Sequence, residues 1–230
     1  MKENALIIGA GLGLSASLAR LLTQNNFNVA IAARNIEKLD KLQAETNSTV
    51  LKCDSSNIKE VENLFVQSDK LLGQPDLVIY NPSARVRGGI TEADPAETQK
   101  ALNITCFGAF LCAQQAAHRM LQRGKGSIFF TGASASVKGY PRSSVFAMGK
   151  FGLRGLAQAL ARELHPKNIH IGHFVIDGGI HAEHRPERKD PGDDSMLSPD
   201  AIADTYLQFH RQDRSSWAWE IELRPWVETF

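Results

Sequence analysis

The chain has 230 residues, of which 43% are hydrophobic and 22% are charged, and its formal net charge at pH 7 is +1. This length and this composition predict one large soluble globular domain that spans residues 1–230. Because the net charge is close to zero, the chain has no basic field that would attract nucleic acid, and we expect no polyanionic partner.

No segment has the pattern of a secretion signal or a membrane span. Three glycines within residues 9–13 interrupt the apolar run near the N-terminus, and no run approaches the roughly 20 apolar residues that cross a bilayer. Cys53, Cys106 and Cys112 are an odd number of cysteines at no metal-ligand spacing, which favours reduced thiols. We therefore expect a cytoplasmic protein without a bound metal and without a membrane partner.

The first predicted element is a short apolar strand, residues 5–8, that ends in a glycine-rich turn. Helix-prone residues follow, and glycines at such a junction let a bulky anion approach the amide groups at the positive end of the helix. A common fingerprint, G-x-G-x-x-G, would have glycine at position 14, so an ordinary strand-to-helix turn is the alternative. The sequence predicts a dinucleotide pyrophosphate site at Gly9, Gly11, Leu12, Gly13 and Leu14.

The second predicted strand, residues 28–33, ends in Arg34 at the place where a dinucleotide-binding fold selects between its cofactors. An acidic residue there would accept a hydrogen bond from the 2′-hydroxyl of the adenosine ribose, whereas an arginine can pair with a 2′-phosphate. Arg34 therefore predicts NADP(H) in preference to NAD(H). The alternative is a solvated arginine at the end of a strand.

Asp54 follows the third predicted strand, residues 49–53, which an amphipathic helix at residues 36–45 precedes. An acidic side chain at the carboxyl end of a parallel strand lies on the side of the sheet where ligands bind, so Asp54 is a candidate contact for the adenine edge. The same carboxylate could instead cap the next helix, Ile58–Leu72, and the two roles do not exclude each other.

Strands and helices continue to alternate along the chain without a repeat or a linker. Strands are expected at residues 76–80, 127–131 and 169–176, and long helices at residues 98–123 and 145–164. This alternation predicts an α/β fold, a Rossmann-type doubly wound parallel sheet in three layers, within a single domain.

The C-terminal part begins with a polar segment, residues 180–197, that has almost nothing apolar to bury and is expected to be mobile without a ligand. It contains His181 and His184, which lack a third ligand and are expected to be solvated or to face a substrate rather than a metal. A helix at residues 201–210 and a half-buried strand at residues 217–224 follow.

In the order of these landmarks, the chain resembles the short-chain dehydrogenases/reductases along its whole length. The glycine turn fits the two central glycines of the family's motif, T-G-x-x-x-G-x-G, at Gly9 and Gly13, and Asn81 stands in a degenerate copy of the N-N-A-G sequence after the fourth strand. The resemblance implies an NAD(P)-dependent oxidoreductase in which Asn81 lies beside the cofactor. It also implies that residues 180–197 form a lid over a small-molecule substrate.

The family's catalytic residues are matched only in part. By resemblance, Asn103 is the structural and proton-relay asparagine, and Lys150 binds the ribose of the nicotinamide. The tyrosine of the family's Y-x-x-x-K motif is replaced by Phe146, whose ring has no ionisable hydrogen and cannot donate a proton. The family's serine falls at Ala133, and Ser134 is the candidate for its role.

The family's P-G pair after the sixth strand reads Asp177-Gly178-Gly179 in this chain. Gly178 and Gly179 preserve the freedom of the backbone, and all three residues are expected beside the cofactor. Asp177 introduces a carboxylate near the expected site of hydride transfer, where burial would favour its protonated form and make it a substitute acid. The alternative is a carboxylate that caps a turn.

Apolar side chains return at the C-terminus, at Trp226, Val227 and Phe230. We expect them to be buried against another subunit, because members of the family often form homodimers or homotetramers through their last strand and their long helices.

Three functions are consistent with these residues. The first is an atypical NADP-dependent oxidoreductase acting on a small carbonyl or alcohol, with Ser134, Asp177, a lid histidine, water or the substrate itself as the acid. The second is a non-catalytic regulator or scaffold that binds the nucleotide but has lost the tyrosine. The third is an enzyme of another chemistry, such as a lyase or an isomerase, because the fold does not dictate the reaction.

Overall fold

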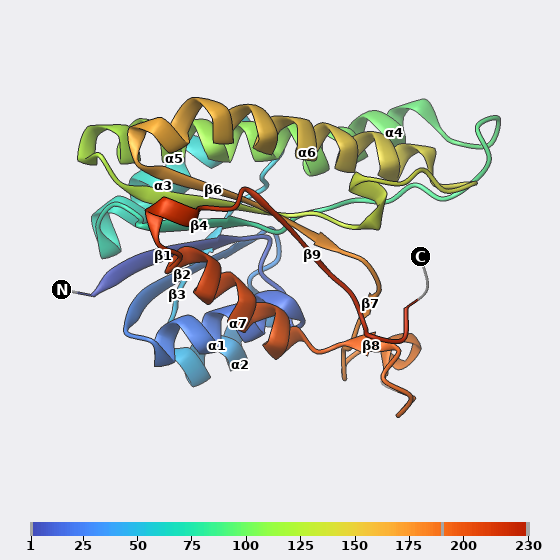
Figure 1. Ribbon diagram of the computed structural model, residues 1–230, viewed down its shortest axis with the longest axis horizontal. Helices are drawn as coiled ribbons and strands as arrows, with labels where there is room; N and C mark the ends of the chain where they lie inside the picture. Colours follow the sequence, from blue (N-terminus) through green and yellow to red (C-terminus); the bar gives the residue numbers. More distant parts are fainter. Residues whose placement is uncertain (1, 190, 229–230) are drawn as a thin grey trace.

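Figure 1 shows the computed structural model of the chain, which describes residues 2–189 and 191–228. Within these residues the centre is a seven-stranded sheet in the order β3-β2-β1-β4-β5-β6-β9, and every neighbouring pair of strands is parallel. The strands are β1 (Glu3–Ile8), β2 (Phe27–Ala33), β3 (Thr49–Lys52), β4 (Leu77–Tyr80), β5 (Gly126–Thr131), β6 (Ile169–Ile176) and β9 (Glu220–Leu223). The predicted Rossmann-type parallel sheet is confirmed.

Helices cover both faces of the sheet and form the outer layers (Figure 1). One face carries α1 (Leu14–Gln24), α2 (Asp40–Thr46) and α7 (Pro199–His210), and the other carries α3 (Ile58–Leu72), α4 (Pro95–Leu102), α5 (Gly108–Arg123) and α6 (Ser144–Leu164). The chain runs outward from β1 to β3 and then crosses back to β4, so the direction of winding reverses between β1 and β4. Ligands of such sheets bind in the crevice at the carboxyl ends of the strands at this switch point.

The strands read as continuous apolar runs because each of them is covered on both faces. In β1, Ile7 points into the core beneath α1 and α7, where it joins Leu18 and Tyr206. Its neighbours Leu6 and Ile8 point into a second core beneath α3, α5 and α6. Successive side chains of a strand face opposite sides, and full burial of each contributes roughly 1.5–3 kcal/mol.

The long helix predicted at residues 98–123 is divided into three parts, which corrects the prediction. It begins earlier, at Pro95, whose fixed φ suits the first position of a helix. A π-helical turn, Asn103–Phe107, then separates α4 from α5. The next residue is Gly108, where any side chain would collide with the hydroxyl of Tyr80. A π turn changes which residues face the sheet, and helical periodicity alone does not reveal that change.

Two further boundaries differ from the prediction. The helix predicted at residues 36–45 begins as a 3₁₀ turn, Glu37–Leu39, before α2. The strand predicted at residues 217–224 pairs with β6 only as β9, from Glu220 onward. The residues before β9 are held by Gln212 instead, which accepts hydrogen bonds from the indole of Trp217 and the amide of the next residue.

The lid segment, residues 180–197, is anchored at both ends. β7 (Gly179–Ile180) pairs in parallel with β8 (Met196–Leu197) in a separate two-stranded sheet (Figure 1). Leu197 is buried in the core beneath α1 and α7, and Ile180 packs against that core. The mobility of the segment stays a prediction, and Asp190 within it lies outside the described residues.

The burial of the C-terminal apolar residues against another subunit stays a prediction. Trp226 is 82% exposed and Val227 is 38% exposed, while Phe230 lies outside the described residues.

Over residues 2–189 and 191–228, no helix is both long enough and apolar enough to cross a membrane. No three metal-ligating side chains come together in that same part of the chain, and the three cysteines are free thiols.

Candidate active site

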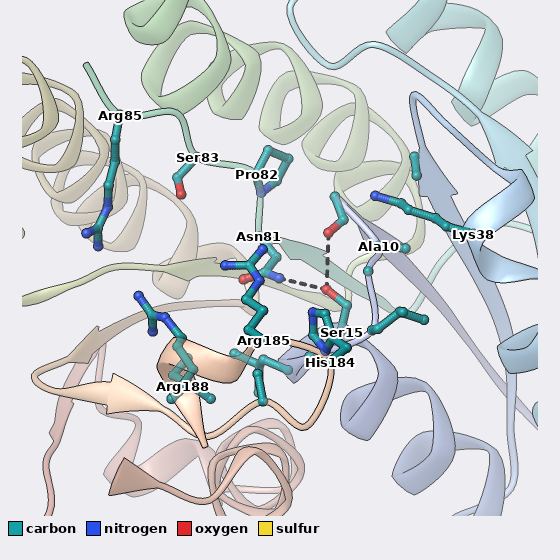
Figure 2. Close-up of a pocket in the computed structure, with 18 of the residues that line it drawn as sticks. Ala10, Ser15, Lys38, Asn81, Pro82, Ser83, Arg85, His184, Arg185 and Arg188 are labelled. Atoms are coloured by element: carbon teal, nitrogen blue, oxygen red, sulfur yellow. Dashed lines mark hydrogen bonds between the residues drawn. The ribbon is translucent and has the colours of Figure 1, made fainter. Parts of the chain in front are cut away.

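The carboxyl ends of the strands open into a cleft with a volume of about 1190 Å³. The turns after β1, β2, β3 and β4 form one wall, and the lid segment forms the other (Figure 2). Pockets for drug-sized ligands usually measure about 300–1,000 Å³, so this cleft has room for a dinucleotide. It lies at the switch point of the sheet, where the fold places its ligands.

The glycine turn after β1 is in direct contact with the loop after β4. Gly9 has a φ of +81°, and a Cβ atom on it would lie 2.7 Å from ring atoms of Pro82. Asn81 Nδ2 donates a hydrogen bond to Ser15 Oγ at 2.6 Å, and Ser15 Oγ donates one to the carbonyl of Gly9 at 3.2 Å (Figure 2). Gly13 begins α1 without a side-chain cap, which leaves the first amides of the helix open to an anion. This geometry fits the pyrophosphate of a dinucleotide.

Most of the predicted cofactor contacts lie in the walls of the cleft. Arg34 is exposed there, and Lys38, from the 3₁₀ turn before α2, lies in the same wall. Gly178 does not line the cleft, but a Cβ atom on it would lie 2.8 Å from Leu197, so glycine lets the turn after β6 pass beneath the lid. The predicted contacts that do line the cleft are Gly9, Gly11, Leu12, Gly13, Leu14, Arg34, Asn81 and Gly179.

Asp54 is not among the described residues that line the cleft. Its carboxylate accepts hydrogen bonds from the amide and the hydroxyl of Ser56, at 3.0 and 2.7 Å. Partial burial acts to raise the pKa of Asp54, but these hydrogen bonds and the positive charge of Arg34 lower it overall. The cap of α3 is Asn57, whose side chain accepts the amide hydrogen bond at the start of that helix. A contact between Asp54 and adenine stays a prediction.

Lys150 and Phe146 share one face of α6, as their spacing predicts, but neither lines the cleft in the described part of the chain. The side chain of Lys150 is buried, and its Nζ donates a hydrogen bond to the carbonyl of Thr131 at 2.6 Å. Burial, together with the nearby charge of Arg85, lowers the pKa of Lys150 to about 7. The Arg85 guanidinium carbon lies 3.9 Å from the centre of the Phe146 ring and covers it. The ribose contact of Lys150 therefore stays a prediction.

The buried state of Lys150 predicts a dependence of stability on pH. The folded chain holds Lys150 at a pKa of about 7, whereas the ordinary value is 10.5. Between these values the unfolded chain binds a proton that the folded chain does not, so the free energy of unfolding rises with pH. Raising the pH from 7 to about 9 is expected to stabilise the wild type by about 2 kcal/mol relative to Lys150→Met. Denaturant unfolding of both chains at both pH values measures this difference, and an equal response of the two would contradict it.

Asn103 opens the π turn and is half-buried, and its side chain makes no hydrogen bond within the described residues. Thr105, two residues later, is buried, and its Oγ1 accepts a hydrogen bond from the amide of Ala84 at 3.0 Å. A Cβ atom on Gly149, the residue before Lys150, would lie 3.0 Å from the side chain of Thr105. Thr105 therefore connects the loop after β4 to the helix that carries Lys150, and the proton-relay role of Asn103 stays a prediction.

Neither Ser134 nor Asp177 lines the cleft in the described part of the chain. The carboxylate of Asp177 is buried and accepts a hydrogen bond from Lys138 Nζ at 3.2 Å, and Arg224 lies 3.3 Å away. Two cations therefore hold this carboxylate in a structural ion pair. Ser134 begins the short 3₁₀ helix Ser134–Ser136 and is half-buried. The geometry thus gives neither residue a contact with a ligand in the cleft.

Cationic side chains in the cleft are the part of the site that the sequence reasoning missed. Arg85 and Arg87 come from the loop after β4, and Arg185 and Arg188 come from the lid. The sequence did carry a signal for them, because each of these two segments has two arginines within four residues. The net charge of +1 for the whole chain concealed it, because acidic side chains elsewhere balance the arginines of the cleft.

Comparisons with known proteins agree with this geometry. A model of the family described as short chain dehydrogenase matches residues 3–190. The 3-oxoacyl-[acyl-carrier-protein] reductase of Bos taurus is 26% identical over 185 residues, which cover 80% of this chain and 78% of that protein. A short-chain dehydrogenase structure from Rhodopseudomonas palustris is 34% identical, with a TM-score of 0.85 over 97% of this chain and 99% of that chain. The structure of an alcohol dehydrogenase from the archaeon Thermococcus sibiricus, complexed with 5-hydroxy-NADP, has a TM-score of 0.87 at 20% identity and covers 100% of this chain and 99% of its own.

Proposed function

Because the chain belongs to the short-chain dehydrogenase family, a family of oxidoreductases, we propose that it transfers hydride between NADP(H) and a small carbonyl compound or alcohol. The observation that carries this proposal is the contact between the glycine turn and the loop after β4, where Gly9 lies against Pro82 and Asn81 reaches Ser15. The archaeal alcohol dehydrogenase, which shares the fold, was solved with a derivative of NADP bound, and this also supports the proposal.

The residues of this chain would bind and enclose the nucleotide. The amides at the start of α1 would hold the pyrophosphate, and the bound nicotinamide would supply or accept the hydride. A Cβ atom on Gly13 would lie 4.0 Å from the His184 ring, so the lid reaches over the glycine turn. Arg185, the next residue of the lid, also lines the cleft (Figure 2). Arg185 would neutralise phosphate charge, and both lid side chains would exclude water when the cleft is occupied.

Arg34 and Lys38 support a preference for NADPH. Each is an exposed cation beside the end of β2, where the 2′-phosphate of NADPH would lie. We expect Arg34→Gln and Lys38→Gln each to weaken NADPH binding by about tenfold and to leave the affinity for NADH unchanged. Calorimetric titration of the wild type and both variants with each nucleotide measures the effect. Equal affinities of the wild type for NADPH and NADH would contradict the preference.

The proton that accompanies the hydride needs a donor within the cleft. Neither Ser134 nor Asp177 lines the cleft, and the position of the family's tyrosine holds Phe146. His181 and His184 of the lid do line the cleft. We therefore propose that a lid histidine or water delivers the proton.

A second function, a nucleotide-binding regulator without catalytic activity, is favoured by one observation. Arg85 covers the Phe146 ring, and Lys150 is buried behind the wall of the cleft. Incubation with NADPH and a panel of small aldehydes and ketones separates the two functions. An oxidoreductase consumes NADPH in excess of the protein with at least one of them, whereas a regulator binds NADPH and leaves it reduced.

We also propose that the chain is a homodimer or homotetramer in the cytoplasm. Apolar side chains are exposed on the outer faces of the two long helices and the turn before α5, at Phe107, Phe110, Met148 and Phe151. Phe107 and Phe110 stack on each other with their ring centres 6.2 Å apart. Such a patch is suited to burial against a second subunit.

A further inference from the structure

The arginines that line the cleft are alike in having no acidic partner. Within residues 2–189 and 191–228, none of the lining arginines (34, 85, 87, 185 and 188) forms an ion pair. Of the nine arginines outside the cleft, six form an ion pair within the same described residues. The pairs are Arg20 with Glu45, Arg119 with Asp69, Arg123 with Asp76, Arg142 with Glu92, Arg154 with Glu220 and Arg224 with Asp177.

Three of the unpaired arginines lie in the same part of the cleft: Arg85 and Arg188 are on the same side of Asn81 (Figure 2), and Arg87 follows Arg85 by two residues in the loop after β4. Burial and the charges of Arg188 and Arg87 lower the pKa of Arg85, so both of these guanidinium groups act on Arg85. Glu187 is the one acidic side chain among the described residues that line the cleft, and it is paired with none of them. Like charges that are held together without an acid favour the binding of an anion.

The Arg85 guanidinium is held in a fixed orientation. It lies over the Phe146 ring, 3.9 Å from the ring centre, and this cation–π contact fixes its plane. The side chain is exposed to the cleft, so its remaining donors are available to a ligand. A planar guanidinium with free donors binds carboxylate or phosphate through two parallel hydrogen bonds.

This cluster lies apart from the groups that would bind the phosphates of the nucleotide. In Figure 2, Arg85 and Arg188 lie on one side of Asn81, and Lys38 lies on the other, beyond Ser15. In this view Asn81 and Ser15 therefore lie between Lys38, near the end of β2, and the guanidinium groups of Arg85 and Arg188. Arg85 instead adjoins Phe146 and Lys150, the residues of the Y-x-x-x-K position.

We propose that Arg85, Arg87 and Arg188 form a receptor for an oxyanion of the substrate, so that the substrate is a carbonyl compound or alcohol that carries a carboxylate or a phosphate. The assignment deepens the proposed function and rests on it for the carbonyl or alcohol. It also gives Phe146 a role: its ring supports the Arg85 guanidinium that selects the substrate.

Calorimetry with the chain saturated with NADP⁺ tests the proposal through binding alone. Succinate serves as the dianionic probe, succinamide as its neutral analogue, and inorganic phosphate as the second oxyanion. We expect at least one of the two oxyanions to bind at least about tenfold more tightly than succinamide. Arg85→Met and Arg188→Met are each expected to weaken that binding by about tenfold, while Arg162→Met, which removes an exposed arginine from the far end of α6, leaves it unchanged.

Two results would overturn the proposal: equal binding of the three probes, or binding of the better oxyanion that Arg85→Met and Arg188→Met leave intact. A parallel loss of NADP⁺ affinity in these two variants would also overturn it, because the cluster would then serve the nucleotide. Repeating the titrations without nucleotide separates this proposal from the proposed function. If NADP⁺ fails to bind but the oxyanion still binds through Arg85 and Arg188, the proposed function fails and the receptor stands.

Discussion

Adding one methyl group at Gly9 is expected to weaken nucleotide binding at least about tenfold and to lower stability by about 1–3 kcal/mol. The backbone at Gly9 has a φ of +81°, which other residues adopt only with strain, and the added Cβ would lie 2.7 Å from Pro82. Because this distance is too short, either the turn or the loop after β4 must move, and both of these segments line the cleft. Titration of Gly9→Ala with NADPH, together with its denaturant unfolding, measures both effects.

Two glycines provide matched controls for this substitution. A Cβ atom on Gly155, in α6, would meet no atom within 4 Å, so Gly155→Ala is expected to weaken neither NADPH binding nor the stability of the fold. Gly11 also has open space around a Cβ atom, but it lines the cleft. Gly11→Ala should therefore weaken NADPH binding while stability is maintained, because the methyl group would occupy the space of the pyrophosphate. Wild-type affinity in Gly9→Ala would contradict the account of the turn.

Restoring the family's hydroxyl groups is expected to increase carbonyl reduction by about 10²- to 10⁴-fold, the usual contribution of a positioned general acid. Phe146→Tyr places a phenol four residues before Lys150, and Ala133→Ser places a hydroxyl at the position of the family's serine. Since Arg85 covers the ring at this position, we expect the double variant to show the gain more clearly with substrates that carry an anion. The rate of NADPH oxidation with matched neutral and carboxylated aldehydes measures it.

Phe146→Leu is the control for that experiment, because it removes the ring that Arg85 covers and adds no proton donor. No gain in the double variant, with NADPH binding preserved, would contradict the view that the missing hydroxyls limit carbonyl reduction. It would favour the regulatory function, or an enzyme whose chemistry needs no general acid at this position.

The fold could be predicted because its signals are local. The run at residues 5–8 reads as a strand buried on two faces, and in the structure Leu6 and Ile7 point into opposite cores. The glycine turn was identified from its spacing, and the predicted contacts within it line the cleft. Arg34 was likewise found from its place at the end of a strand, although its preference for NADP(H) stays a prediction.

The environment of the site could not be predicted, because it depends on residues far apart in the sequence. The buried state of Lys150 and the cover over Phe146 both involve Arg85, which comes from the loop after β4. The contact of Thr105 with the loop after β4 depends on a π turn, and side-chain periodicity carries no signal for that turn. The two cations that hold Asp177 come from residues 138 and 224, on two different segments.

The central claim is that the cleft between the glycine turn, the loop after β4 and the lid binds a nicotinamide nucleotide. Equilibrium titration of the wild-type chain with NADPH and with NADH tests it most directly. We expect saturable binding of one NADPH per chain in the micromolar range, with weaker binding of NADH. Absence of binding of both nucleotides at millimolar concentration, in a chain that unfolds cooperatively, would contradict it.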